Sequence, residues 1–288
     1  MKQSKPYFSI IVPTLNEGHY LPKLLGDLDH QTFKDFEVII VDGHSDDNTV
    51  NEAKAFSNLN PKIITTKQRN VSHQRNLGAA RAKADWIIFF DADNQLSPSF
   101  LEDLVNNLDS TKTDAFTCFI KPDSTHLGDK TVAQTINLSV AATIFFGQPE
   151  VIGAIIGIKK NVFNTTTGFN PDIKHREDSD LFRRVSKHHK VTVFKYPQII
   201  FSFRRFKKEG TLKLIRKYAK IRLKSLINPN NVKFSDYPML GGAYYDSLTK
   251  QPLVFDFTKL EQNLKRLTAK QKAKFKQFLE TFLEDQTP

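Results

Sequence analysis

Two aspartates separated by a single residue, Asp91 and Asp93, come directly after the apolar run from Trp86 to Phe90. A short apolar run of aromatic and β-branched residues predicts a buried central strand. Ligands of open α/β sheets bind beyond the carboxyl ends of such strands, and paired carboxylates there suit a divalent cation that neutralises a diphosphate. The pair therefore indicates chemistry on a nucleotide-linked substrate, although the same spacing also suits a turn or the N-cap of the helix expected after Pro98.

The elements that must position these carboxylates alternate between strands and helices in units of about 30 residues, which favours a parallel sheet covered by helices. Ser72 is the predicted N-cap of the third helix. The predicted strands are 8–12, 36–41, 62–66, 86–90, 115–120, 151–158 and 191–203. The predicted helices are 19–29, 49–57, 72–83, 98–108, 131–146 and 178–188. The first half therefore resembles a doubly wound nucleotide-binding layer.

The composition limits the cellular compartments and the classes of binding partner that we expect for this protein. Cys118 is the one cysteine, which excludes an internal disulfide and fits a reducing compartment. No segment approaches the roughly 18 uncharged apolar residues of a membrane span, so we expect a cytoplasmic protein. The net charge of +11 is concentrated in residues 183–233, where Glu209 is the one acid. Such a stretch suits nucleic acid, anionic lipid or a phosphorylated acceptor, or is a solvated basic surface.

The segment from Thr211 to Ile227 is predicted to form a basic amphipathic helix. Its basic face carries Lys213, Arg216, Lys217, Lys220 and Lys224. The opposite face is apolar, a pattern that fits a helix lying on an anionic membrane surface and fits equally a helix packed on its own domain. The first reading places the protein at the inner face of the membrane as a peripheral protein.

Four short segments carry a family resemblance. They are Val12-Pro13-Thr14-Leu15-Asn16-Glu17, Asp42-Gly43-His44-Ser45-Asp46, Arg75-Asn76-Leu77-Gly78 and Asp91-Ala92-Asp93. In order and spacing they resemble the V-P-x-x-N-E opening, the D-G-S-x-D segment, the A-R-N-x-G helix start and the D-x-D of family 2 glycosyltransferases of the GT-A fold. Gly153-Ala154, Gly168-Phe169-Asn170 and Glu177-Asp178-Ser179-Asp180-Leu181 resemble the acceptor-side elements of that family, so the resemblance covers roughly residues 7–205.

The sequence departs from the family pattern in a few places. His44 stands where Gly or Ser is more usual, Asp47 is an extra acid, and Gln74 replaces the usual Ala. The Q-x-x-R-W element of processive members is not visible, which argues for the transfer of a single sugar rather than for polymerisation.

The resemblance implies a set of donor-binding residues for a nucleotide-diphospho-sugar, either UDP- or GDP-linked. Asn16 or Glu17 would accept bonds from the ribose or base, and Asp42 would read the base edge. The guanidinium groups of Arg69 and Arg75 would meet phosphate or base. Asp91 would face the ribose or the metal, and Asp93 would bind Mg²⁺ or Mn²⁺ between the phosphates, where a metal acts as a Lewis acid. The full predicted set is Pro13, Thr14, Asn16, Glu17, Asp42, Arg69, Arg75, Asp91 and Asp93.

The resemblance also implies an acceptor side. Asp178 would be the general base that deprotonates the acceptor hydroxyl, with Glu177 and Asp180 positioning it or contacting the acceptor. Crowded carboxylates raise the pKa of one of them toward the working range; the alternative is an acid-rich helix N-terminus, which the helix dipole favours. Arg204 and Arg205 would hold the diphosphate or an anionic acceptor, or are surface charge. His73, His175, His188 and His189 lack zinc-like spacing and are interpreted as solvated.

Taken together, we expect a GT-A doubly wound, mostly parallel sheet over 1–205 and a basic helical extension over 206–288. The predicted activity is metal-dependent, inverting transfer of one sugar to the hydroxyl of a surface glycan or a lipid-linked carrier. Inversion is inherited from the resemblance. Two alternatives remain: a GT-A-like nucleotidyltransferase, which usually carries a glycine-rich phosphate loop that Pro13–Gly18 does not supply, and a basic nucleic-acid-binding protein, which the acids at 177–180 argue against.

Overall fold

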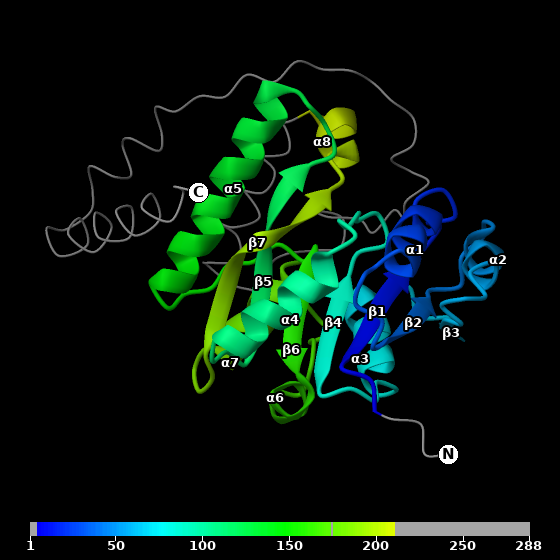
Figure 1. Cartoon of the computed structure of the whole chain (residues 1–288), viewed down its shortest axis with the longest axis horizontal. Helices are drawn as coiled ribbons and strands as arrows, with labels where there is room; N and C mark the ends of the chain where they lie inside the picture. The colour runs from blue at the N-terminus through cyan, green and yellow to red at the C-terminus, as the bar shows by residue number, and fades with distance from the viewer. Residues whose placement is uncertain (1–4, 174, 211–288) are drawn as a thin grey trace, which may run out of the picture.

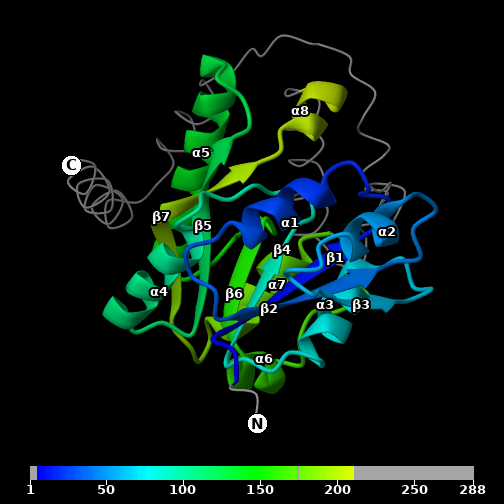
Figure 2. The ribbon, with the colours of Figure 1, turned by 45° about the vertical axis from the view of Figure 1, so that its right-hand side comes forward.

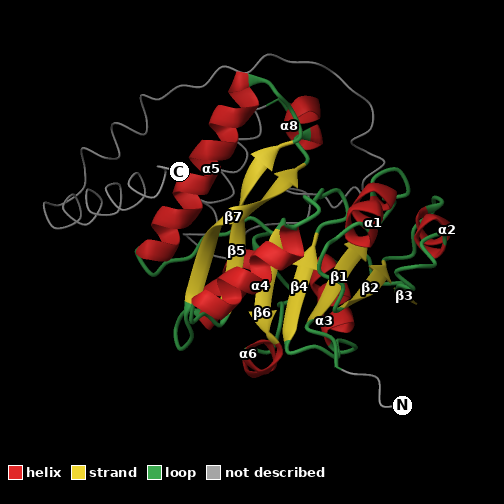
Figure 3. Ribbon diagram, in the orientation of Figure 1, coloured by secondary structure: helices red, strands yellow, loops and turns green. Residues whose placement is uncertain are grey.

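A computed structural model describes residues 5–173 and 175–210 of the chain. Figure 1 shows a single twisted sheet between layers of helices, and Figure 3 separates the two element types by colour. The strands are β1 (Phe8–Thr14), β2 (Phe36–Asp42), β3 (Lys62–Thr65), β4 (Trp86–Phe90), β5 (Ala115–Pro122), β6 (Ile155–Lys159) and β7 (Val191–Phe201). The helices are α1 (Leu21–Asp29), α2 (Thr49–Lys54), α3 (Val71–Ala79), α4 (Phe100–Ser110), α5 (Leu127–Phe145), α6 (Lys160–Thr165), α7 (Glu177–Val185) and α8 (Arg204–Glu209).

The order of the strands creates a crevice between β1 and β4. The sheet runs β3-β2-β1-β4-β6-β5-β7, so the chain starts near the centre, moves outward to β3 and then returns to β4. All pairs are parallel except those of β6, which runs antiparallel to both β4 and β5. The prediction of a mostly parallel, doubly wound sheet is therefore confirmed. The carboxyl ends of β1 and β4 meet at a topological switch point, where open α/β sheets bind ligands.

The core lies on both faces of the sheet because the central strands are buried on both sides. On β1, Phe8, Ile10 and Val12 join the core cluster that includes α1 and α4, whereas Ile11 faces the cluster with α3, α6 and α7. Figure 1 shows α4 crossing in front of the sheet, and in Figure 2 α1 lies in front of it. Helix α3 approaches β1 closely at Gly78, where an added Cβ would lie 2.5 Å from Cγ2 of Ile11. This close packing holds the last turn of α3 against β1.

Two local expectations were wrong. The N-cap of α3 is Asn70 and not Ser72, because Asn70 Oδ1 accepts the backbone N–H of His73 at 3.0 Å while Ser72 is already helical and buried. The strand predicted over 151–158 begins only at Ile155, and the preceding residues form a turn that passes over Arg75 and Asp178.

The predicted domain boundary between residues 205 and 206 stays a prediction. In the structure, this position lies within α8 (Arg204–Glu209). The predicted basic helix over 211–227 lies outside the described residues. Among the helices that the structure describes, none has the length and apolar character to cross a membrane.

Candidate active site at the switch point

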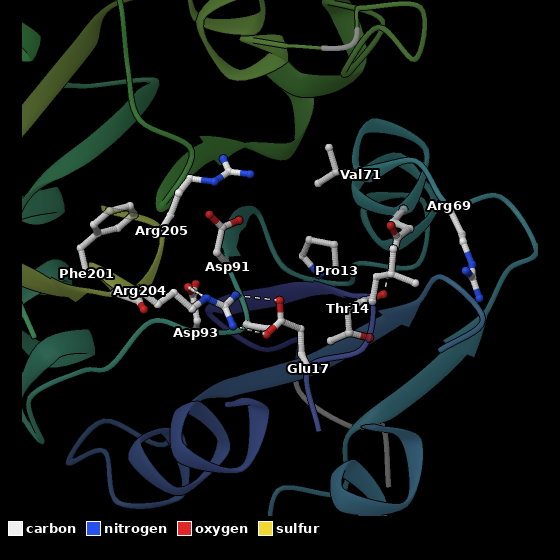
Figure 4. A pocket seen from close by; sticks show the side chains of 14 residues that line it. Pro13, Thr14, Glu17, Arg69, Val71, Asp91, Asp93, Phe201, Arg204 and Arg205 are labelled. Carbon is white, nitrogen blue, oxygen red and sulfur yellow. Dashed lines mark hydrogen bonds and ion pairs between the residues drawn. The ribbon is translucent and has the colours of Figure 1, made fainter. Parts of the chain in front are cut away.

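A pocket of about 250 Å³ opens at the carboxyl ends of β1 and β4. We call it the switch-point pocket. Its wall includes eight residues that the sequence singled out: Pro13, Thr14, Glu17, Arg69, Asp91, Asp93, Arg204 and Arg205. In Figure 4, Thr14, Arg69 and Val71 lie toward one end, while Asp93, Arg204, Arg205 and Phe201 lie toward the other, with Asp91 and Pro13 between them. The structure thus brings together residues that are up to 192 positions apart (Pro13 to Arg205).

Arg204 holds the acidic end of the switch-point pocket together. Its Nη1 and Nη2 donate to the two carboxylate oxygens of Glu17 at 3.1 and 2.9 Å, and its Nε lies 3.0 Å from Asp93 Oδ2. The guanidinium also lies 4.2 Å over the ring of Tyr20. Burial raises the pKa of Glu17 to about 7, although Arg204 opposes the shift, and the charges of Asp93 and Asp91 raise it further. Three carboxyl groups, those of Glu17, Asp91 and Asp93, thus lie close together, and a bound cation would reduce the repulsion between them.

Arg75 links the end of β4 to the start of α7 from behind the pocket. It is 2% exposed, and it donates from Nη2 to Asp91 at 3.0 Å and from Nη1 to Glu177 at 2.8 Å. Its guanidinium lies 5.1 Å over the ring of Phe169. Burial raises the pKa of Asp91 to about 6 despite the opposing charge of Arg75. Arg75 does not line the pocket; instead it positions a carboxylate on each side.

Asp178 is buried at the first turn of α7, where Oδ1 accepts the backbone N–H of Ser179 at 2.6 Å. Burial raises its pKa to about 7; Glu177 raises it further, and Arg75 lowers it. A carboxylate with a pKa near neutrality is suited to general-base work. Gly153 covers this group so closely that a Cβ there would lie 3.0 Å from Asp178 Oδ2 and 3.1 Å from Arg75 Nη2.

Three predicted site residues serve the surrounding loops in this structure. Asp42 is buried and accepts hydrogen bonds from Thr14 Oγ1 and from the backbone N–H and hydroxyl of Ser45. Asn16 takes a left-handed φ of 54° and accepts the N–H of Asp46 at 2.7 Å. Asp180 pairs with Arg184 at 2.9 Å. None of the three lines the switch-point pocket, so their predicted substrate contacts stay predictions.

The departures from the family pattern have structural partners. His44 adopts a left-handed φ of 60°, and its carbonyl accepts a hydrogen bond from Arg69 at 2.8 Å. Asp47 accepts the N–H of Gly18 at 3.0 Å and that of Thr49 at 3.0 Å, tying the loop after β1 to the start of α2. Gln74 lines the pocket and donates hydrogen bonds to two backbone carbonyls, a role that no sequence signal indicated.

The paired aspartates fit a divalent cation. Among residues 5–173 and 175–210, no group of three or more His, Cys, Asp or Glu side chains is placed to hold a metal ion by itself. Mg²⁺ is commonly held by one or two carboxylates together with substrate phosphates. Asp93 and Asp91 supply two carboxylates at the pocket wall, beside a third at Glu17, and their mutual repulsion is what a cation relieves.

A doubly wound sheet with paired aspartates at its switch point is the architecture of GT-A transferases. The chain belongs to glycosyl transferase family 2, whose family model matches residues 9–170. The prediction of that family is confirmed.

Individual relatives share parts of the chain. The poly(ribitol-phosphate) beta-N-acetylglucosaminyltransferase TarP of Staphylococcus aureus is 39% identical over 103 residues, which are 34% of this chain and 32% of that protein. An uncharacterized glycosyltransferase of Haemophilus influenzae is 30% identical over 190 residues, 65% of this chain and 64% of that protein. The chain thus spans between about a third and two thirds of the length of these relatives.

Solved structures share the fold. The mannosyltransferase PcManGT of Pyrobaculum calidifontis, in complex with GDP-Man and Mn²⁺, superposes with a TM-score of 0.62 at 19% identity, covering 78% of this chain and 65% of that one. S. aureus TarS 1–349 in complex with UDP-GlcNAc superposes with a TM-score of 0.58 at 18% identity, covering 96% of this chain and 80% of that one. The GT-A fold is therefore confirmed.

Proposed function

We propose that this chain is a metal-dependent, inverting glycosyltransferase that moves a single sugar from a nucleotide-diphospho-sugar to a hydroxyl acceptor. The observation that carries the proposal is the switch-point pocket, with Asp91 and Asp93 in its wall. Arg75 links Asp91 to Glu177, and the buried Asp178 follows Glu177 in the chain and is affected by the charges of both Arg75 and Glu177. One connected group of charges thus supplies a donor side and a base.

On the donor side, the polarity of the switch-point pocket supports one orientation of the nucleotide. The diphosphate would lie toward Asp93, Arg204 and Arg205, where cationic side chains and a carboxylate-bound cation can neutralise it. Asp93, together with Asp91, would hold Mg²⁺ or Mn²⁺, which supplies Lewis-acid stabilisation of the departing nucleoside diphosphate. For this to happen, Arg204 must give up its contact with Asp93 Oδ2 and can then meet the phosphates.

On the acceptor side, Asp178 would take the proton of the acceptor hydroxyl as its oxygen attacks the anomeric carbon from the face opposite the leaving group. One such displacement inverts the anomeric configuration. Glu177 is held by Arg75 at 2.8 Å, and its charge helps to keep the pKa of Asp178 near 7. Because Gly153 packs against Asp178, the turn before β6 controls the space in which sugar and acceptor meet.

The solved structures in complex with GDP-Man and UDP-GlcNAc support a nucleotide-sugar donor, and the names of the sequence relatives guide the choice of acceptor. TarP is named for N-acetylglucosamine transfer to poly(ribitol-phosphate), and other relatives 39% identical over 94 residues are named for PGL/p-HBAD biosynthesis. We extend this class to the present chain as UDP- or GDP-linked donors and a surface glycan or lipid-linked carrier as acceptor. The basic segment 211–227 is proposed to bring the enzyme to an anionic membrane surface.

The test is a thermal-shift series with UDP, GDP and their sugars, with and without Mn²⁺, followed by a donor screen for released nucleoside diphosphate. We expect a shift that requires Mn²⁺ and turnover that Asp93→Asn abolishes. The exposed Asp172→Asn is the control and should keep wild-type turnover. No shift with any nucleotide, together with salt-sensitive binding of DNA or RNA, would contradict the transferase and favour the nucleic-acid alternative.

A further inference from the structure

Gln74 lines the switch-point pocket, and its side-chain amide is held in one orientation. Its side chain lines the pocket, and its Nε2 donates to the carbonyl of Thr14 at 2.8 Å and to the carbonyl of Val41 at 2.7 Å. A backbone carbonyl can only accept, so both partners must face the amide nitrogen and the side chain has one possible orientation. Both amide hydrogens are then used, and Oε1 is the polar atom that remains for a ligand.

The surrounding backbone is built to hold this orientation. Thr14 ends β1 and Val41 precedes the last residue of β2, so Gln74 joins the carboxyl ends of two parallel strands from the first turns of α3. Gly43 makes the room, because a Cβ at that position would lie 3.2 Å from Gln74 Nε2 and 3.3 Å from the carbonyl oxygen of Thr14. Gln74 is 4% exposed, and a buried amide held by two hydrogen bonds keeps one geometry.

The position of Gln74 in the pocket indicates which part of a nucleotide it meets. It bonds Thr14, and Thr14 and Val71 lie at the end of the pocket away from Asp93 and Arg204. With the diphosphate at the acidic and cationic end, the nucleobase reaches the Thr14 end. Asp42, the predicted reader of the base edge, is 1% exposed, and both of its oxygens already accept hydrogen bonds from the protein.

We infer that Gln74 is a specificity-determining residue that selects bases with an imide or amide N–H, namely uracil at N3 or guanine at N1, by accepting that hydrogen at Oε1. The inference rests on the proposed function. An ordinary glutamine accepts and donates and therefore tolerates either kind of base edge. Here the donors are consumed by the backbone, so the residue offers an acceptor alone. Cytosine presents an unprotonated N3 in the same place and is disfavoured.

The test uses isothermal titration of the full chain in Mn²⁺ with UDP and GDP and, for the tighter of the two, its N-methyl analogue, 3-methyl-UDP or 1-methyl-GDP. In the wild type we expect the methylated ligand to bind at least roughly fivefold more weakly, the value of one hydrogen bond. Gln74→Ala should weaken the unmethylated ligand by about the same factor and leave the methylated one unchanged, so that the discrimination disappears in the double-mutant cycle.

Gln31→Ala is the matched control. Gln31 is also buried, and its Nε2 also donates to two backbone carbonyls, those of Asp27 and Ser97, but it does not line the pocket. The Gln31→Ala variant should have a lower melting temperature but unchanged affinities for the parent and the methylated ligand. Equal wild-type affinity for the parent and methylated ligands would overturn the role of Gln74 alone, whatever the stability of the variants. Failure of the wild type to bind UDP and GDP at all would instead overturn the proposed function, and this inference with it.

Discussion

Replacing Asp178 with asparagine should make the protein more stable and less active at the same time. Burial raises the pKa of Asp178 from 3.8 to about 7, so the folded state disfavours its charge. The folded protein holds the proton more tightly than the unfolded chain, and stability contributed by this group is therefore complete below pH 4 and is lost as the pH rises toward 7. Asparagine stays neutral, and its Oδ1 can still accept the N–H of Ser179.

The magnitude follows from the difference between the two pKa values. At 1.36 kcal/mol for each pH unit, the interval from 3.8 to about 7 corresponds to at most about 4 kcal/mol at pH 8. For a domain of this size, that is roughly 10 °C in melting temperature. The gain should shrink to a small value as the pH falls toward 4. Whereas stability rises, activity should fall: loss of the general base should lower kcat by about 10²- to 10⁴-fold.

The assay is thermal unfolding of wild type and Asp178→Asn at pH 4.5, 6 and 8, paired with nucleoside diphosphate release. The control is Asp172→Asn, because Asp172 is exposed and lies shortly before α7. At each pH this variant should match the wild type in melting temperature and in nucleoside diphosphate release. A variant that is no more stable than the wild type at pH 8, or a difference that does not change with pH, would refute the buried-charge reasoning. Retained turnover would refute the role as base.

Three further predictions concern other residues of the site. Arg75→Met leaves Asp91 and Glu177 without their shared counter-charge and should lower the free energy of unfolding in urea by about 3–5 kcal/mol; a loss below about 1 kcal/mol would contradict the linkage. Gly153→Ala should cost about 1–3 kcal/mol and most of the turnover through its contacts with Asp178 and Arg75, whereas Gly26→Ala, with nothing within 4 Å, should stabilise slightly. Arg204→Met frees Asp93 and should tighten Mn²⁺ binding severalfold without nucleotide, measured by electron paramagnetic resonance; unchanged or weaker binding argues against competition for that carboxylate.

Much of the fold was accessible from local patterns. The run Trp86–Phe90 was predicted as a strand with the bounds that β4 has, because an aromatic and β-branched run between polar segments leaves few alternatives. The alternation of strands and helices predicted the parallel sheet, and the rule that such sheets bind ligands at strand ends placed Asp91 and Asp93 at a ligand site. The family resemblance added Glu17, which lines the same pocket. The antiparallel insertion of β6 between β4 and β5 was not predictable, because period and composition carry no strand direction.

By itself, the sequence determined the class of this protein and the ends of the strands where its chemistry lies, because hydrophobic periodicity and motif spacing are local properties. Only the tertiary structure decided what each charged or polar group contacts. It showed that Arg75 forms a buried link between Asp91 and Glu177, and it paired Arg204 with Glu17 across 187 positions. Burial and hydrogen-bond partners decide pKa values and orientation, and both depend on residues distant in the chain.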